Sequence, residues 1–394
     1  MKIAHFLLTG IGFLAGMADA QPAMTIYGTF KENGSPQPTD AGGAKTAFIN
    51  DGAPSSISMY GTIDSGIRHV TNTTASGGST TKLGSNGEYY NNRLGIKGTE
   101  NLGGGLNVHF HLESGFNTGT GELDNKENRL FNRISSIGIA GSFGSLDFGR
   151  QPSVACKAVY SYEPFQYRYV HIIPLAGAVA GNIDGKVRSP YGPMNSFGTI
   201  DGPRFSNGIQ YFGKFGSFTA SAEYIMGEVP GSSRNQAAKA VGLVYNDGIF
   251  TVGGAYTKQK PNIAAAGAIT PDYREQNQIT FGGGYKIDAL RITGGYINTT
   301  TAITSQAKNI WLGARYDFTS AASLTAGYYR TTLEATRNEI ARRNLLIVGA
   351  TYALSPRTSL YADIDQAVLH GLASLPPGRQ TRQTGISAGI SHMF

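Results

Sequence analysis

Apolar and polar residues alternate with a period of two along most of the chain from Ile57 onward. In residues 105–113 the apolar positions are Leu106, Val108, Phe110 and Leu112, and the polar positions are Asn107, His109, His111 and Glu113. Such alternation places the apolar side chains on one face of a β-strand. Residues 276–287 and 307–318 repeat it, and no stretch with helical periodicity competes, so the pattern predicts an all-β protein.

The repeated segments predict sixteen strands. They span approximately residues 57–70, 88–101, 105–117, 129–142, 144–150, 203–215, 217–227, 238–247, 249–259, 276–287, 290–300, 307–318, 322–332, 342–355, 357–367 and 382–394. Tight turns, such as 101–104, alternate with longer polar loops, such as 71–87. An antiparallel meander with short turns at one rim and long loops at the other has this rhythm. A soluble sandwich or jelly roll is the alternative, but it would not separate its loop lengths so strictly.

Composition narrows the class of protein further. Glycine contributes 54 of the 394 residues, charged residues make up 15 %, and the mean hydropathy is −0.19. These values exclude a coiled coil, a charge-rich disordered chain and a disulfide scaffold. The sequence has no apolar run of ~18 residues, which excludes a helical membrane protein. A transmembrane β-barrel remains, because its apolar surface is carried by every second residue.

The cost of burying charge in lipid predicts which face of each strand points toward the lipid and which toward the lumen. A basic side chain facing lipid at mid-membrane costs ~2–4 kcal/mol, so the polar parity should face the lumen and the apolar parity the lipid. Tyrosines near the ends of the apolar parity should form an aromatic girdle at headgroup level. They are Tyr245, Tyr256, Tyr285, Tyr296, Tyr316 and Tyr352.

The N-terminal residues precede the predicted barrel. Residues 1–20 combine Lys2, a short apolar core and a small-x-small ending at Ala20, which predicts a secretory signal peptide. Residues 21–55 are an N-terminal extension, in which residues 24–30 partly repeat the pattern of 57–70. Either segment could supply the first strand. We favour 57–70, which makes residues 56–394 the barrel.

Charge and cysteine content add no other partner. The net charge is +7, but the basic residues are scattered singly and do not form the stripe that a nucleic acid requires. The single Cys156 excludes an intrachain disulfide. No zinc spacing or phosphate loop occurs, so we expect neither a metal nor a cofactor.

The connection at residues 151–203 breaks the regular rhythm. About fifty residues without a strand pattern are too many for an ordinary surface loop. A barrel of sixteen strands encloses a wide lumen, which a loop folded inward can narrow. A disordered external loop is the alternative, but this segment carries aromatic residues that favour packing. They are Tyr160, Tyr162, Phe165, Tyr167 and Tyr169.

Several motifs occur in a familiar order. Residues 92–106 read NRLGIKGTENLGGGL, and 112–116 read LESGF. Residues 131–133 read FNR and lead to GSLDFGRQ at 144–151. Together with the first strand at 58–66 and the ending GISHMF, they closely resemble the general-diffusion porins of the Gram-negative outer membrane. The resemblance spans about residues 56–394.

This resemblance implies a homotrimer of sixteen-stranded barrels, each with a water-filled pore narrowed by the third loop. It also implies a row of arginines on the wall opposite that loop, and by motif these are Arg93, Arg133 and Arg204. Strand parity independently supports Arg93 and Arg204. Arg133 fits less well, because Ile137 and Ile139 share its parity. Lys97 lies on the face of Arg93 and should add positive charge at another depth.

The third loop departs from the family pattern in its charges. Many relatives carry an acidic residue soon after the arginine of GRQ, whereas this chain has Lys157. Glu163 and Asp184 are the best candidates for acidic partners of the arginines. The excess of basic residues predicts passive diffusion of small hydrophilic solutes and ions with a mild preference for anions.

Three features predict assembly. Ser136, Gly138 and Ala140 are expected to face outward as small residues at a trimer contact. Arg150 shares the outward parity of Phe148, and should meet a carboxylate in a neighbour's second loop; a solvent-exposed strand end is the alternative. Phe394 resembles the terminal aromatic residue by which the barrel-assembly machinery recognises outer-membrane proteins.

An outer-membrane enzyme and a substrate-specific channel are the alternatives to a diffusion pore. An outer-membrane enzyme would need a clustered catalytic set, and His109 and His111 do share a parity with Glu113. A polar lumen wall explains these three residues better, since no recognisable nucleophile accompanies them. A substrate-specific channel differs from a diffusion pore in that one solute would block its conductance.

Overall fold

The computed structural model describes residues 55–74, 76–84, 88–125, 128–169, 172–173, 203–262, 270–301, 305–335, 338–371 and 381–394. The long strands are β1 (Ser56–Val70), β3 (Arg93–Gly103), β4 (Leu106–Gly115), β5 (Ile134–Gly141), β6 (Gly144–Pro152), β7 (Arg204–Phe215), β8 (Phe218–Ile225), β9 (Ala238–Asn246), β10 (Phe250–Gln259), β11 (Gln276–Ile287), β12 (Leu290–Thr301), β13 (Ser305–Asp317), β14 (Ala322–Ala335), β15 (Asn338–Ala353), β16 (Thr358–Gly371) and β17 (Arg382–Met393). Two short elements accompany them, β2 (Thr80–Leu83) and the helix α2 (Val154–Tyr160). Over these residues, no helix combines the length and the apolarity needed to cross a membrane.

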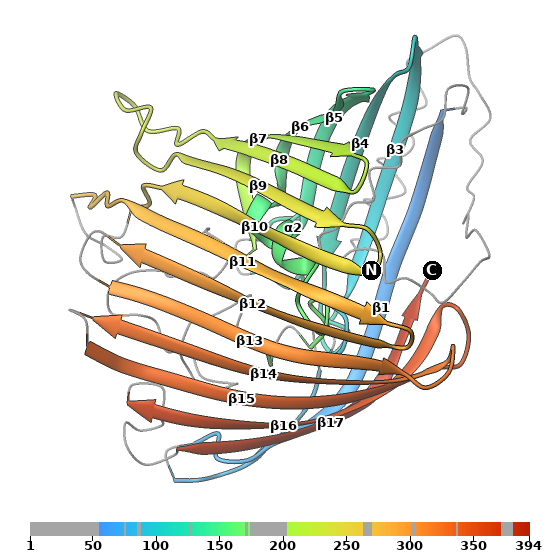
Figure 1. Cartoon of the computed structure of the whole chain (residues 1–394), viewed down its shortest axis with the longest axis vertical. Coiled ribbons are helices and arrows are strands. Elements are labelled where there is room, and N and C mark those ends of the chain that lie inside the picture. Colours follow the sequence, from blue (N-terminus) through green and yellow to red (C-terminus); the bar gives the residue numbers. More distant parts are fainter. Residues whose placement is uncertain are drawn as a thin grey trace.

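The long strands form one closed antiparallel barrel (Figure 1). Each strand pairs with its neighbours in sequence, and β1 closes the ring by pairing with β17 from Thr62–Met393 to Val70–Gly385. The short β2 pairs with the loop end of β1. The prediction of a sixteen-stranded barrel is confirmed, and 57–70 is its first strand. Residues 1–54, which include the predicted signal peptide and residues 24–30, lie outside the described residues.

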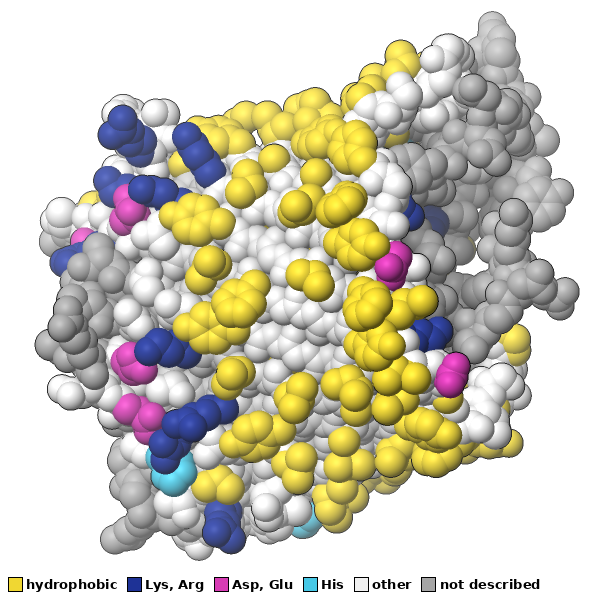
Figure 2. Space-filling view, in the orientation of Figure 1, with side chains coloured by type: hydrophobic (Ala, Val, Ile, Leu, Met, Phe, Trp, Pro, Cys, Tyr) yellow, Lys and Arg dark blue, Asp and Glu magenta, His cyan; other side chains and the backbone are white. Residues whose placement is uncertain are grey.

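The two faces of the wall follow the predicted parity. Outward side chains such as Ile67, Val252 and Leu312 are more than 60 % exposed, whereas Asp64 and Gln278 on the inward face are buried. The cross-strand register also places all six predicted girdle tyrosines on the outward face. Figure 2 shows the apolar side chains in two bands separated by a zone of backbone and small residues. This surface is suited to lipid.

The inward face is less uniformly polar than the alternation suggested. On β13 to β16 it carries Trp311, Tyr329, Leu345, Ile347 and Leu369, all buried. These residues form a hydrophobic cluster with the third loop. The prediction of a polar lumen wall is therefore wrong for this side of the barrel, because the loop packs here as a small core of its own.

The described part of the third loop crosses the inner wall from β8 to β16. The N-terminus of α2 is tied to β8, where the Val154 N–H donates to Glu223 at 3.1 Å. Tyr162 stacks on Trp311 of β13, with ring centroids 6.0 Å apart. Arg343 of β15 then donates to the Ile172 carbonyl at 2.6 Å. The loop is thus held at both ends of its described path.

Glycines on the inward face make room for this loop. A Cβ added to any of them would lie within 3 Å of a loop side chain. The pairs of wall glycine and loop residue are Gly242 with Val154, Gly282 with Tyr162, Gly313 with Pro164, Gly327 with Phe165, and Gly349 with Tyr169. We call these five positions the glycine track. The contacts are close because glycine has no side chain to hold the loop away from the wall strands.

Buried polar contacts tie the seam of the barrel to the first loop. Arg68 of β1 forms an ion pair with Asp365 of β16 at 2.8 Å. Four residues earlier on β1, Asp64 accepts the Tyr361 hydroxyl at 2.9 Å and the Glu88 N–H at 2.8 Å. Asp64 also accepts the N–H groups of the next two residues, so it folds the end of the first loop inward.

Candidate functional site

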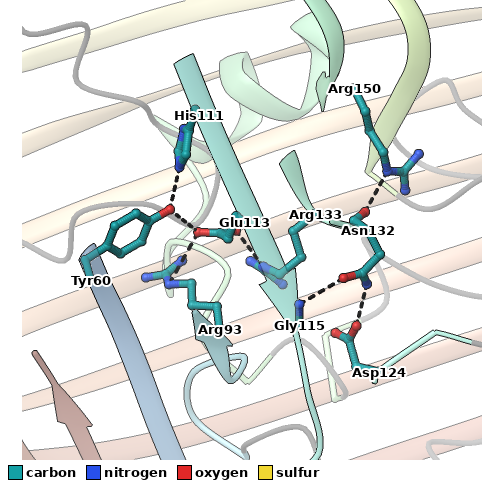
Figure 3. Close-up of polar contacts among 9 residues, drawn as sticks. All are labelled: Tyr60, Arg93, His111, Glu113, Gly115, Asp124, Asn132, Arg133 and Arg150. Atoms are coloured by element: carbon teal, nitrogen blue, oxygen red, sulfur yellow. Dashed lines mark hydrogen bonds and ion pairs between the residues drawn. The ribbon is translucent and has the colours of Figure 1, made fainter. Parts of the chain in front are cut away.

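One carboxylate and two arginines meet on the lumen face of β3, β4 and the start of β5 (Figure 3). The tight turn after Asn101 pairs β3 with β4 so that Gly95 lies opposite Glu113 and Arg93 opposite Gly115. Glu113 and Arg93 are therefore diagonal neighbours on one face. Arg133 reaches the same carboxylate from the residue before β5. All three side chains are at most 5 % exposed.

Glu113 is the centre of this arginine cluster. Its carboxylate accepts Arg133 Nε at 2.6 Å and the Tyr60 hydroxyl at 2.7 Å, and Arg93 Nε lies 3.9 Å away. Tyr60 also contacts His111 (Figure 3). Buried like charges repel strongly unless a counter-charge lies between them, so Glu113 is what permits two guanidinium groups to share this wall.

Arg204 and Lys97 extend the positive charge. Arg204 opens β7 opposite Pro152, beyond an irregularity in the pairing of β6 with β7. Lys97 lies opposite His111 on the lumen face, is exposed, and places its ammonium 5.3 Å from the centre of the Tyr60 ring. The structure therefore brings Arg93 and Arg133 together on one carboxylate, with Lys97 beside them.

The position of Arg133 explains its poor fit to the parity. The paired ladder of β5 begins only at Ile134, opposite Glu113. Arg133 precedes the ladder in a bend, and its N–H donates to the Glu113 carbonyl at 3.1 Å. Period-two alternation does not apply across that bend, and so Arg133 points inward although Ile137 points outward.

Lys157 does not join the arginine cluster. It lies on α2, and its ammonium donates to Gln151 at 3.3 Å and to Gln210 on β7. Gln210 in turn donates to Glu223 at 2.8 Å. Lys157 therefore secures the helix to the wall, although it is partly exposed and its charge remains on the lumen side.

Glu163 is not an acidic partner of the arginines. Its carboxylate is buried on the β14 side, where it accepts the Tyr329 hydroxyl and, at 2.9 Å, the Tyr167 N–H. Burial raises the pKa of Glu163, and these hydrogen bonds oppose the rise. Its expected role as an acidic partner of the constriction arginines is wrong, because the loop packs with this side chain toward the wall. Asp184, the other expected acid, lies outside the described residues.

The expected outward position of Ser136, Gly138 and Ala140 is also wrong. The register of β4 and β5 places them opposite His111, His109 and Asn107, and opposed residues share a face. A Cβ on Gly138 would lie 2.5 Å from Asp147 Oδ1 and 2.7 Å from His109 Nε2. Gly138 leaves room for the lumen side chains of His109 and Asp147 in front of it.

Arg150 lies opposite Ser135, on the outward parity of Phe148. Its guanidinium donates to the Asn132 carbonyl at 2.6 Å and to Ser206 at 2.8 Å. Asn132 contacts Asp124 of the second loop and accepts the Gly115 N–H at 2.9 Å (Figure 3). Arg150 thus supports the base of its own second loop.

Phe394 completes the pairing of the last strand. Its N–H and carbonyl exchange hydrogen bonds with Gly61 of β1 at 3.1 and 3.0 Å. The ring is 40 % exposed and lies over Gly61, where a Cβ would be 2.4 Å from it. The C-terminal aromatic is therefore presented on the outer surface at the seam.

Sequence reasoning missed the role of Glu113. The sequence shows that Glu113 has the lumen-facing parity and that a tight turn sets it diagonal to Arg93. The family resemblance, however, points to the third loop for the acidic partners of the arginines. Within the described ranges, no group of three or more His, Cys, Asp or Glu side chains could hold a metal ion.

Comparison with known proteins places the barrel in a family. A sequence model of the Gram-negative porins matches residues 7–367. This chain belongs to the Gram-negative porin family. The porin is therefore an outer-membrane channel, and the prediction that it is not an enzyme is confirmed.

The relatives agree with this placement. The porin is 28 % identical over 383 residues to an outer membrane porin protein of Bordetella pertussis, covering 87 % of this chain and 95 % of the relative. It is 25 % identical over 367 residues to outer membrane porin protein 32 of Delftia acidovorans, with the same coverage. The structure of the anion-selective porin from Comamonas acidovorans has a TM-score of 0.69 at 24 % identity, covering 86 % of this porin and 100 % of that chain. This last likeness shows the fold.

Proposed function

We propose that this porin lets small hydrophilic solutes and ions diffuse passively and mildly favours anions. The observation that carries the proposal is the arginine cluster. Two guanidinium groups, Arg93 and Arg133, share one carboxylate, Glu113, which leaves a net charge of +1. We include Arg204, at the start of β7, among the basic residues of this wall. The exposed Lys97 adds to it.

The field of this cluster acts on ions because the surrounding wall has a low dielectric constant. Charges of one sign lining a passage raise the local concentration of counter-ions, and a ring of basic side chains is the usual basis of anion preference. The preference should be mild, since Glu113 cancels part of the charge. A solved porin of similar fold is named anion-selective, which agrees with the proposal.

A reversal potential tests the selectivity. With the purified oligomer in a planar bilayer under a tenfold KCl gradient, we expect a potential of the sign that indicates chloride permeating faster than potassium. Raising the salt on both sides should reduce the preference, because the Debye length falls from ~10 Å at 0.1 M to ~3 Å at 1 M. A potential close to the potassium equilibrium value would contradict the proposal.

The active form is proposed to be a homotrimer in which Arg150 contacts the second loop of a neighbouring barrel. Arg150 has the outward parity and already supports the base of its own second loop. One solved porin of similar fold is described in a trimer form, which agrees with the proposal.

Replacing Arg150 by alanine is expected to abolish the SDS-resistant oligomer while the monomer still folds. Gel mobility of unheated and heated samples measures both properties. Ser206→Ala is the matched control, since it removes the intrachain partner at 2.8 Å but keeps the guanidinium. An R150A protein that remains fully trimeric would remove Arg150 from the contact, and equal loss in S206A would assign the effect to the intrachain hydrogen bond.

We also infer that the barrel-assembly machinery recognises the C-terminal strand through Phe394. The exposed ring beside Gly61 is compatible with recognition before β1 and β17 pair.

A further inference from the structure

Three basic residues lie side by side on the lumen face near the short turns of β11, β12 and β13. Lys286 is directly opposite Arg291, and Arg291 is directly opposite Arg315. They point inward because the residues that follow them in sequence are exposed on the lipid face, namely Ile287, Ile292 and Tyr316. Figure 1 shows the three strands adjacent, with their short turns at one edge of the barrel. Short turns lie at the periplasmic rim of such barrels, so this basic row lies at the periplasmic mouth of the lumen.

The positive charge of the basic row is only partly compensated. Arg315 forms an ion pair with Asp317 at 2.9 Å, and both side chains are partly exposed. Within the described residues, neither Lys286 nor Arg291 forms an ion pair. The nearby Glu163 already accepts two hydrogen bonds within the buried core of the loop. The row and Asp317 together carry a net charge of +2. Like charges directly opposite on neighbouring strands destabilise a sheet, so a bound anion would stabilise this arrangement.

The third loop holds the guanidinium of Arg291 in position. Its Nη2 donates to the Ser161 carbonyl at 2.5 Å. Ser161 directly follows α2 and precedes Tyr162, whose ring occupies the space in front of Gly282 in the glycine track. Within the described part of the chain this is the one hydrogen bond of the guanidinium, so its other N–H groups are available to a ligand. A group that is already oriented binds at a lower entropic cost.

We propose that the basic row binds the phosphate group of small phosphorylated solutes at the periplasmic mouth of the pore. Neighbouring strands are ~4.8 Å apart, so the charged ends of two adjacent side chains can reach the oxygens of one phosphate. A guanidinium forms two parallel hydrogen bonds with a phosphate, and a lysine adds a point charge. A phosphate ester carries about −1.5 to −2 charges at pH 7, which complements the net charge of the row. Chloride has neither the second charge nor the oxygens that such a fork recognises.

The basic row is separate from the arginine cluster. Arg93 begins β3 at its loop end, whereas the row lies at the turn ends of β11, β12 and β13. The inference rests on the proposed function, in which the cluster gives a general preference for anions, and it adds a site that retains one class of anion. A phosphate held in the row should therefore slow the flow of chloride in a saturable way.

Single-channel recording of the purified oligomer can test the site in dilute KCl, where charges are least screened. Glycerol phosphate is the probe and glycerol the uncharged comparison. Glycerol phosphate should reduce the wild-type current to a saturating level, and inorganic phosphate should act at a similar concentration, because the row contacts the phosphate group alone. Arg291→Gln should raise the half-blocking concentration about tenfold through loss of charge-assisted hydrogen bonds. Lys286→Gln should raise it several-fold, and it removes no described contact with the loop.

Lys214→Gln is the matched control. Lys214 is an exposed, lumen-facing lysine near a short turn of β7, but it lies opposite Thr219 and not opposite another basic residue. The variant makes the same change of charge on the same rim, and its half-blocking concentration should stay within about twofold of wild type. Arg291→Lys keeps the charge but loses the planar fork. It should weaken the block several-fold while the reversal potential in KCl stays at the wild-type value.

The site is overturned if phosphate blocks Arg291→Gln and Lys286→Gln as it blocks wild type. It is also overturned if Lys214→Gln loses as much as they do, which would assign the block to the charge of the whole rim. A wild-type channel that prefers chloride in KCl but is blocked by neither phosphate would overturn this inference alone. A channel that prefers potassium, yet is blocked by phosphate through Arg291, would instead overturn the proposed selectivity and support the site.

Discussion

Replacing Glu113 by glutamine is expected to destabilise the barrel by about 3–5 kcal/mol, the usual effect of removing one partner from a buried ion pair. Glu113 is 2 % exposed and separates Arg93 from Arg133. Glutamine keeps the shape but removes the counter-charge, so the two guanidinium groups repel. The midpoint of urea unfolding, followed by gel mobility, measures the loss.

The same substitution should increase anion selectivity several-fold, because the cluster then carries one more net positive charge. Reversal potentials in KCl gradients measure this change alongside stability. Glu122→Gln is the control: this exposed carboxylate of the second loop should alter stability by less than about 0.5 kcal/mol. A second variant, Glu113→Gln with Arg133→Met, should recover much of the stability, since it removes the unpaired charge. An unchanged selectivity in Glu113→Gln would mean that the cluster does not act on permeating ions.

Filling the glycine track with Gly327→Val and Gly349→Val is expected to lift the third loop from the wall. A Cβ on Gly349 would lie 2.8 Å from the Tyr169 ring, and one on Gly327 would lie 2.9 Å from the Phe165 ring. Only side-chain atoms are met at either position, so the strands themselves tolerate valine. Overpacking costs about 1–3 kcal/mol at each site. The third loop should therefore detach from the inner wall and move toward the lumen axis.

Single-channel recording should show the result as a lower mean conductance with frequent sublevels. Gly253→Val is the control, because a Cβ there would meet Val244 of the neighbouring strand at 2.8 Å and no loop residue. The control should keep a steady current. If the double variant conducts like wild type, the described contacts between the loop and the wall do not determine the width of the channel.

The barrel could be predicted from the sequence because alternation is a local property. Each strand carries its own pattern of lipid-facing and lumen-facing residues, and turns such as that after Asn101 fix the register of the hairpin. Arg93 was found by the same logic, since it lies within a regular ladder. Arg204 lies beyond an irregularity in the pairing of β6 with β7, where alternation no longer decides the face.

The remaining site residues depend on contacts between distant segments. Arg133 lies in a bend where parity fails, and Glu163 is turned toward Tyr329, more than 160 positions away in sequence. Ser136, Gly138 and Ala140 look like contact residues by size, but they face the lumen, and His109 and Asp147 lie in front of Gly138. The apolar inner face of β13 to β16 could not be predicted from the strands alone, because its apolar residues pack against the third loop.

The pairing of β1 with β17 closes the barrel and also affects the position of the third loop. Tyr169 of the third loop packs on Tyr89, which follows the first strand, and on Tyr361, which comes from the second-last. The first and the last strands of the barrel must therefore be in place before the loop makes all of its contacts with the wall. We therefore propose that the hydrogen bonds between β1 and β17 also help to set the width of the passage, because the loop lacks part of its wall until they form.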